Sequence, residues 1–255
     1  LDIKASALDA SGNPVAIGTV VDVDLAPVAI TISSVTDDNV LNAAEKGQDL
    51  VLSGTSSNVE AGQTVTIIFA GKTYTTTVDA NGDWTWTVPA ADLSGLKDGD
   101  ASVQVSVTNV NGNAASSAQA FSVDTTAPTV TINTISGDNM LNAAEAAQDL
   151  TLSGTSTAEA GQTVTVIFNG NQYTAQVQAD GSWTLDVPAA DLAGITDGGV
   201  AVTATVSDKA GNPASAGSSV LVDTTVPQIS FNIVAGDDIV NIAEHGQALI
   251  VSGKV

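Results

Sequence analysis

Apolar and polar residues alternate with a period of two along most of the chain, in short runs rich in Val, Ile and Thr that are bounded by Gly, Asn and Asp. This alternation is typical of half-buried β-strands. The turn pairs Asn169-Gly170 and Asp180-Gly181 predict tight hairpins between successive runs. Between Pro128 and Pro227 the pattern predicts seven strands, near residues 130–135, 149–156, 163–168, 172–177, 183–187, 200–207 and 218–222. The predicted fold class is all-β, with the strands arranged as a sandwich.

The pattern is repeated along the chain. The sequence Val-Asp-Thr-Thr-Ala-Pro at 123–128 returns as Val-Asp-Thr-Thr-Val-Pro at 222–227, and in weaker form at 23–27. The proline biases the residue before it towards an extended conformation, which indicates a short, stiff linker. We therefore predict tandem seven-strand immunoglobulin-like β-sandwiches arranged end to end. The predicted domains are two complete repeats at 27–126 and 127–225, flanked by the last strands of a preceding repeat at 1–26 and the first strands of a following one at 226–255.

Large apolar residues stand at equivalent positions of the two repeats. Trp84 and Trp183 both occupy the fifth strand, and Trp86 and Leu185 follow two residues later on the same face. Burial in the core is the favoured interpretation, and an exposed binding aromatic is the alternative. Phe69 and Phe168, and Val105 and Ala204, are further expected core pairs.

The only extended helical signal lies in the loop after the first strand. Asn42, Asn142 and Asn241 are each followed three residues later by Glu. This spacing predicts a capping box, in which Asn caps a helical turn and Glu reaches back.

Composition limits the possible functions. The chain has 28 Asp and Glu against 6 Lys and Arg, for a net charge of −22. Nucleic acids and anionic membrane surfaces are therefore unsuitable partners, and cations are suitable ones. The sequence has no cysteine and one histidine, His245, so it predicts neither a disulfide framework nor a thiolate metal site. No apolar run is long enough for membrane insertion, and any export signal is expected to lie outside this sequence.

Several aspartates are expected to meet where one repeat joins the next, because the strand order sorts alternate loops to opposite poles of a sandwich. The end of the first repeat that adjoins the second, its far pole, is predicted to carry Asp38, Asp49, Asp92, Asp98 and Asp124. These residues are expected to face Asp208 of the second repeat. The second repeat offers Asp138, Asp149, Asp191, Asp197 and Asp223 in the same way, and Asp24 precedes the first proline linker.

Such carboxylates would repel one another, since two charges 4 Å apart cost roughly 4 kcal/mol even at an effective dielectric constant of about 20. A bound cation removes this repulsion, and a set of oxygen ligands on loops suits Ca²⁺ best. The alternative is that these aspartates only form turns and cap strand ends, as Asp commonly does.

The residues also resemble a known family. The Asp-Thr-Thr-Ala-Pro linker, the Asn-Ala-Ala-Glu loop, the Gly-Asp-Trp or Gly-Ser-Trp before the fifth strand and Asp-Lys-Ala-Gly-Asn-Pro before the last strand are similar to the bacterial Ig-like repeats of giant type I-secreted adhesins. The resemblance implies a rod retained on the bacterial cell surface, involved in adhesion and biofilm formation, with Ca²⁺ at the junctions between domains. It places metal ligands at Asp38, Asp124, Asp138, Asp208 and Asp223, whereas Asn109 stands where Asp9 and Asp208 stand in the other copies.

Three functions compete. The first is a structural extender, a monomeric extracellular rod whose partners are neighbouring repeats and whose adhesive ligand binds elsewhere. The second is a binding module whose own surface engages a glycan, a host protein or another copy of the rod. Its aromatic content of 4% weakens this alternative, because binding sites favour aromatic anchors. An enzyme is not expected, because one histidine and no cysteine leave no triad or zinc site to build.

Overall fold

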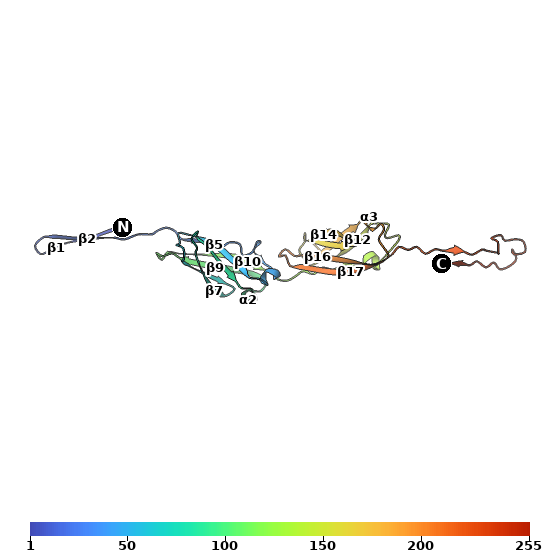
Figure 1. Ribbon diagram of the computed structural model, residues 1–255, viewed down its shortest axis with the longest axis horizontal. Coiled ribbons are helices and arrows are strands. Elements are labelled where there is room, and N and C mark those ends of the chain that lie inside the picture. Colours follow the sequence, from blue (N-terminus) through green and yellow to red (C-terminus); the bar gives the residue numbers. More distant parts are fainter. The chain divides into compact units, whose positions relative to one another are not determined.

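The computed structural model describes residues 1–255, and its contacts divide the chain into two compact units, Leu1–Thr126 and Ala127–Val255. The first unit begins with a hairpin of β1 (Asp2–Leu8) and β2 (Pro14–Val20), whose residues are all exposed. The second unit ends with the short pair β18 (Ser230–Phe231) and β19 (Gly253–Lys254). Each unit also contains one sandwich domain (Figure 1).

The first domain is a sandwich of a three-stranded and a five-stranded sheet. The smaller sheet has the order β3-β5-β8 and the larger one the order β4-β10-β9-β6-β7, in which β4 runs parallel to β10. The strands are β3 (Ala29–Ile30), β4 (Val40–Leu41), β5 (Leu50–Ser57), β6 (Thr64–Phe69), β7 (Lys72–Thr77), β8 (Asp83–Val88), β9 (Gly99–Thr108) and β10 (Ala114–Val123).

The second domain repeats this arrangement. Its larger sheet has the order β11-β17-β16-β13-β14, and β12 pairs with β15 in the smaller one. The strands are β11 (Met140–Asn142), β12 (Leu150–Thr155), β13 (Thr163–Phe168), β14 (Asn171–Gln176), β15 (Ser182–Val187), β16 (Gly198–Ser207) and β17 (Pro213–Asp223). The prediction of tandem all-β, Ig-like domains is confirmed.

The cores contain the expected residues. Phe69 and Trp84 are each 1% exposed in the first domain, as are Phe168 and Trp183 in the second. The favoured interpretation of the two tryptophans as core residues is therefore confirmed. Val105 and Ala204 are also buried, and Trp86 is half-buried against Tyr74, with ring centroids 5.7 Å apart.

Each tryptophan also holds the first segment of its domain against the smaller sheet. The indole nitrogen of Trp84 donates to the carbonyl of Thr31 at 3.1 Å, and Trp183 donates to Thr131 at the same distance. A Cβ at Gly54 would lie 2.0 Å from the Thr31 carbonyl oxygen. Glycine is therefore required there, because any side chain would push the first strand away from the tryptophan.

This contact corrects the prediction of a first strand over 130–135. In the structure an isolated bridge joins Val130 to Ser156, and the amides of Thr131 and Asn133 donate to the carbonyls of Thr155 and Ser153, both at 2.8 Å. The carbonyl of Thr131 accepts a hydrogen bond from the indole of Trp183, and the amide of Thr155 donates to the hydroxyl oxygen of Thr131 at 3.0 Å. The regular ladder is interrupted because side chains occupy the backbone groups that would continue it.

Helix is confined to short segments in two loops of each domain, the loop after the first strand, where it was expected, and the loop before β9 or β16. These segments are α1 (Ala43–Lys46), α2 (Ala90–Leu93), α3 (Ala189–Leu192) and the 3₁₀ turn η1 (Ile135–Gly137). The capping box of Asn42 and Glu45 is formed in both directions, and the same hydrogen bonds recur at Asn142 and Asn241. The capping prediction is confirmed. None of the helices has the length and apolar character needed to cross a membrane.

Candidate functional site

Each linker aspartate stabilises its own turn. The Oδ1 atom of Asp24 accepts from the amide of Ala26 at 3.0 Å, that of Asp124 from Thr126 at 3.1 Å, and that of Asp223 from Thr225 at 3.2 Å. Asp commonly stabilises turns by accepting from the backbone two residues on. The turn therefore starts in the same way at all three linkers.

A second carboxylate binds the two threonines that follow Asp124. This linker follows β10 (Figure 1). The Oδ1 atom of Asp98 accepts from the amide of Thr125 at 3.0 Å and from its hydroxyl at 2.7 Å. The Oδ2 atom accepts from the hydroxyl of Thr126 at 2.6 Å. These hydrogen bonds, that of the Thr126 hydroxyl first, lower the pKa of Asp98 because they favour its charged form. We call this arrangement the linker clasp.

The second domain repeats the clasp with its own residues. Asp197 accepts from the amide and hydroxyl of Thr224, both at 2.7 Å, and from the hydroxyl of Thr225 at 2.6 Å. The pKa of Asp197 is lowered, chiefly by the Thr225 hydroxyl. Sequence reasoning placed Asp98 and Asp197 near the linkers but overlooked the threonine hydroxyls. The doubled Thr-Thr in both linkers is the signal that could have identified them.

Asp38 and Asp138 lie in the loop that precedes the capping box. Asp38 accepts through Oδ1 from the amide of Val40 at 2.9 Å and from the hydroxyl of Thr36 at 3.1 Å. Asp138 accepts from the amide of Met140 at 2.8 Å, also through Oδ1. The loop of Asp38 lies close to the linker of Asp124, because the amide of Asp124 donates to the carbonyl of Leu41 at the end of that loop.

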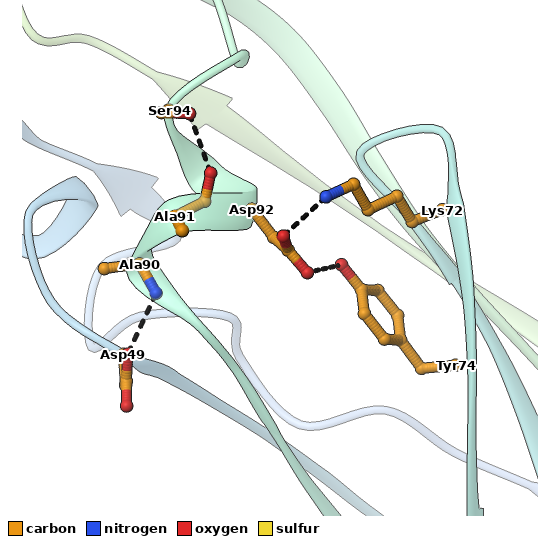
Figure 2. A network of polar contacts seen from close by, with 7 residues as sticks. All are labelled: Asp49, Lys72, Tyr74, Ala90, Ala91, Asp92 and Ser94. Atoms are coloured by element: carbon orange, nitrogen blue, oxygen red, sulfur yellow. Dashed lines mark hydrogen bonds and ion pairs between the residues drawn. The ribbon is translucent and has the colours of Figure 1, made fainter.

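Asp49 and Asp92 have structural partners in the first domain. Figure 2 shows Asp49 accepting from the amide of Ala90 at the start of α2, at 2.9 Å. Asp92 on α2 faces Lys72 and Tyr74 of β7, forming an ion pair with the first and a 2.8 Å hydrogen bond with the second. Lys72 lowers the pKa of Asp92. Burial, together with Asp92, raises the pKa of Tyr74 to about 12.

The second domain keeps part of this network. Asp149 accepts from the amide of Ala189 at 2.8 Å, and Asp191 accepts from Tyr173 at 2.8 Å. Asn171 stands in the place of Lys72, so the ion pair is replaced by a neutral side chain. Asp49, Asp92, Asp149 and Asp191 therefore hold the helical turns of their own domains.

Asp208 is buried in the loop between β16 and β17. Its Oδ1 atom accepts from the amide of Asn212 at 2.8 Å, and its Oδ2 atom accepts from the Asn212 side-chain amide at 3.0 Å. Asp9 and Asn13 form the same pair in the loop between β1 and β2, at 2.9 Å for both contacts. Glu159 supports the loop of Asp208 by accepting from the amide of Lys209 at 3.0 Å. Sequence reasoning did not foresee this role for Glu159.

The loop between β9 and β10 differs because Asn109 stands where the other copies have Asp. Its Oδ1 atom accepts from the amides of Asn111 and Asn113 at 3.1 and 2.9 Å, so its side-chain nitrogen points outwards to Asp24 at 3.2 Å. The side-chain amides of Asn111 and Asn113 also donate to Oδ2 of Asp24, at 2.8 and 3.4 Å. Asn111 contributes most to lowering the pKa of Asp24.

The predicted metal ligands differ in how well they suit a cation. The hydrogen bonds of Asp38, Asp138 and Asp223 engage Oδ1, which leaves Oδ2 as an oxygen ligand. Asp24 is different, since three amide groups direct N–H donors at its Oδ2 atom. Within either unit, no three carboxylate or histidine side chains gather in a group that could hold a metal.

Comparisons with known proteins agree with the fold. The family model of the bacterial Ig-like domain matches residues 33–125 and again 126–224. None of the curated protein sequences matches the chain.

Among solved structures, the chain is similar to a Ca²⁺-stabilised adhesin with which an Antarctic bacterium binds ice. The two are 36% identical, with a TM-score of 0.54, over 99% of this chain and 64% of that one. This chain therefore spans less than two thirds of that adhesin structure.

A second similar structure concerns the host cell surface retention of a 1.5-MDa bacterial ice-binding adhesin. It is 34% identical, with a TM-score of 0.51, over 90% of this chain and 76% of that one. A tetra-tandem repeat from the extending region of a large adhesion protein is 29% identical over 99% of this chain and 62% of that one, with a TM-score of 0.36. Two consecutive family matches, together with the two sandwich domains, show that the chain belongs to the bacterial Ig-like domain family, in the form found in adhesin repeat regions.

Proposed function

We propose that this chain is a structural extender segment of a bacterial surface adhesin that serves cell adhesion and biofilm formation. The protein is exported by type I secretion and is extracellular, held at the bacterial cell surface. Its partners in this chain are the neighbouring Ig-like repeats, which form a monomeric rod, and its cell-surface or matrix ligand is bound by regions outside this segment. The similarity to two adhesin structures supports this proposal.

The observation that carries the proposal is the repeated linker clasp. Asp98 and Asp197 each accept three hydrogen bonds from the Thr-Thr pair that follows the last strand of their domain. A linker that only connects domains has no need of such contacts. A clasp present in both copies restricts the direction in which the chain leaves each domain, as a spacer requires.

Calcium would complete the junctions. We propose that Ca²⁺ binds where the linker carboxylates Asp124 and Asp223 meet the following repeat, with Asp208 as the ligand that the second repeat offers to Asp124. Asp38, Asp98, Asp138 and Asp197 contribute oxygen atoms from the same poles. The ion would neutralise carboxylates that otherwise repel one another, and so stiffen the rod. One of the similar adhesins is described as Ca²⁺-stabilised, which supports this assignment.

The alternative, a binding module, has less support. A hollow of about 650 Å³ on the second domain is open, and hydroxyl-bearing residues such as Thr165, Thr205 and Ser207 line it, with no aromatic or arginine side chain among its lining residues. Binding energy at recognition sites concentrates in buried aromatic and arginine anchors, whereas this hollow offers hydroxyl groups. We therefore favour the extender.

Two measurements on the full chain test the proposal. Isothermal titration with calcium chloride should show saturable binding that weakens in Asp124→Ala. Asp83→Ser is the matched control, because Asp83 is exposed and Ser182 stands at its place in the second domain. A glycan array should show no binding, as expected of a spacer. Absence of any calcium binding would refute the metal assignment, and a specific glycan signal would favour the binding module.

A further inference from the structure

The linker that enters the first domain differs chemically from the one that leaves it. Asp24 is followed by Leu25 and Ala26, whereas Asp124 is followed by two threonines. Opposite Asp24 stand the three asparagines of the β9–β10 loop, and the equivalent loop of the second domain has Asp208, Ala210 and Asn212 at the same places. The asparagine donors are thus a property of one loop and not of the repeat as a whole.

The orientation of Asn109 is fixed by its own loop. Its side-chain oxygen accepts from two backbone amides, those of Asn111 and Asn113. Rotating the side-chain amide by 180° would place its nitrogen against these two donors and lose both hydrogen bonds. Because Asn109 is 4% exposed, water could not replace them. The nitrogen must therefore face outwards, where it donates to Asp24.

Asn113 is redirected as a result. In the loops that begin with Asp9 and Asp208, the last asparagine donates its side-chain amide back to that aspartate, at 2.9 and 3.0 Å. Asn109 offers a nitrogen at this point instead of an oxygen, and Asn113 donates to Asp24. Replacing one carboxylate by an amide therefore turns two side chains towards the linker, and Asn111 adds the shortest of the three contacts, at 2.8 Å.

The backbone of this linker is held as well. The side-chain amide of Asn58 donates to the carbonyl of Pro27 at 2.7 Å, and the amide of Asn113 also approaches the carbonyl of Asp24 at 3.4 Å. N–H groups direct the positive ends of their dipoles at the linker oxygens. Three of these donors converge on one oxygen, Oδ2 of Asp24, and so occupy the lone pairs that a cation would need. In contrast, Oδ2 of Asp98 and Oδ2 of Asp197 each accept a single hydrogen bond.

We propose that the linker entering the first domain is fixed by the side-chain amides of Asn109, Asn111 and Asn113, in place of a calcium ion, and that it stays ordered without calcium. The inference refines the calcium-stiffened extender proposed above. Asp24 then leaves the set of calcium ligands, and the array contains junctions of two kinds. Calcium loss would make the calcium-binding linkers flexible while leaving the linker at Asp24 ordered.

The test uses the full chain and introduced cysteines, since the sequence has none of its own. Spin labels at Thr19→Cys and Ser106→Cys, both exposed, span the first linker, and distances between them are measured by pulsed electron paramagnetic resonance. We expect a single narrow distance peak in calcium chloride and the same peak in a calcium chelator. Broadening of the peak in chelator would overturn the proposal.

Two substitutions test the asparagines with little risk to folding, because each introduces a residue that the second domain carries at the same place. Asn111→Ala corresponds to Ala210, and Asn109→Asp corresponds to Asp208. In chelator, the double variant should lose the narrow peak. A variant that keeps it would show that the amides do not hold the linker. Asn81→Ala, in an exposed turn of the same domain, is the control and should leave the peak unchanged.

A second label pair separates this inference from the proposed function. Ser106→Cys with Thr205→Cys spans the linker at Asp124, and both sites are exposed. A calcium-independent peak for the first pair supports the amide-held linker whatever the second pair does. If the second pair is also unaffected by calcium, the calcium proposal fails while the inference about Asn109, Asn111 and Asn113 stands.

Discussion

The two domains have the same core and different loops. Trp84 and Trp183 make the same hydrogen bond to the first strand, and Gly54 and Gly154 face them at the same close approach. The loops after β9 and β16 instead carry amides in one copy and a carboxylate in the other. The shared part is what makes the sandwich fold, and the variable part lies next to the linkers. We conclude that the repeat keeps its fold constant while the chemistry of its junctions changes.

The largest effect should come from filling the space beside a core tryptophan. In Gly54→Ala the new Cβ would lie 2.0 Å from the Thr31 carbonyl oxygen and 2.8 Å from the Trp84 ring. Overpacking of a core typically costs 1–3 kcal/mol, and because the obstacle here is backbone we expect about 3 kcal/mol or more. Hydrogen–deuterium exchange with mass spectrometry should show faster exchange in the first domain alone.

Gly154→Ala should do the same to the second domain, where the Cβ would lie 1.9 Å from the Thr131 carbonyl oxygen. Gly217→Ala is the control, because it has open space and Ala118 stands at its place in the first domain. Unequal effects of the two core substitutions would contradict the equivalence of the cores.

A smaller effect should follow from removing a capping asparagine. Asn42 accepts from the amides of Ala44 and Glu45, and Asn142 makes the same pair of contacts. Loss of such a cap costs about 1 kcal/mol. Asn42→Ala and Asn142→Ala should therefore lower the stability of their own domains by similar amounts in chemical denaturation. A much larger loss in one domain would show that its loop has a further role.

The smallest effect should be a pH dependence of the linker clasp. Hydrogen bonds from the threonines lower the pKa of Asp98 in the folded state. The carboxylate therefore contributes stability above its ordinary pKa, 3.8, and this contribution is lost as the pH falls through the lowered value. The Thr125 amide donates to Asp98, so its protection relative to the intrinsic exchange rate at each pH should fall at acidic pH in the unmodified chain, and should already be low at neutral pH in Asp98→Asn.

Asp197→Asn should act in the same way on the amide of Thr224, because the contacts of Asp197 match those of the first clasp. Asp37→Asn, at an exposed carboxylate outside the clasp, is the control. If neutral-pH exchange at the threonines is unchanged in Asp98→Asn, the clasp does not order the linker.

The fold could be read from the sequence because alternation, turn pairs and the repeat all indicate the same sandwich. The first strand could not be placed in full, because its ladder is interrupted by the indole of Trp183 and the hydroxyl of Thr131, which are side-chain contacts between distant segments. The short strands β4 and β11 were also missed. Two or three residues are too few to show a period.

The candidate site was predicted less completely. The capping asparagines and the linker aspartates were recognisable because each is repeated at fixed spacing. The partners of Asp98 were not recognised, since a threonine hydroxyl has no pattern of its own. The sequence shows Asn109 at the place of an aspartate, but the effect of Asn109 on Asn113 depends on which hydrogen bonds the loop has already made. Such competition for donors becomes visible only in three dimensions.

The most direct test of the calcium-stiffened extender compares the two linkers in one chain. Pulsed electron paramagnetic resonance on the Ser106→Cys and Thr205→Cys pair should give a narrow distance distribution in calcium chloride and a broad one in chelator, with Asp124→Ala broad in both. The Thr19→Cys and Ser106→Cys pair should stay narrow throughout. Identical distributions with and without calcium at the Asp124 linker would contradict the account, and the aspartates there would then act only as turn residues.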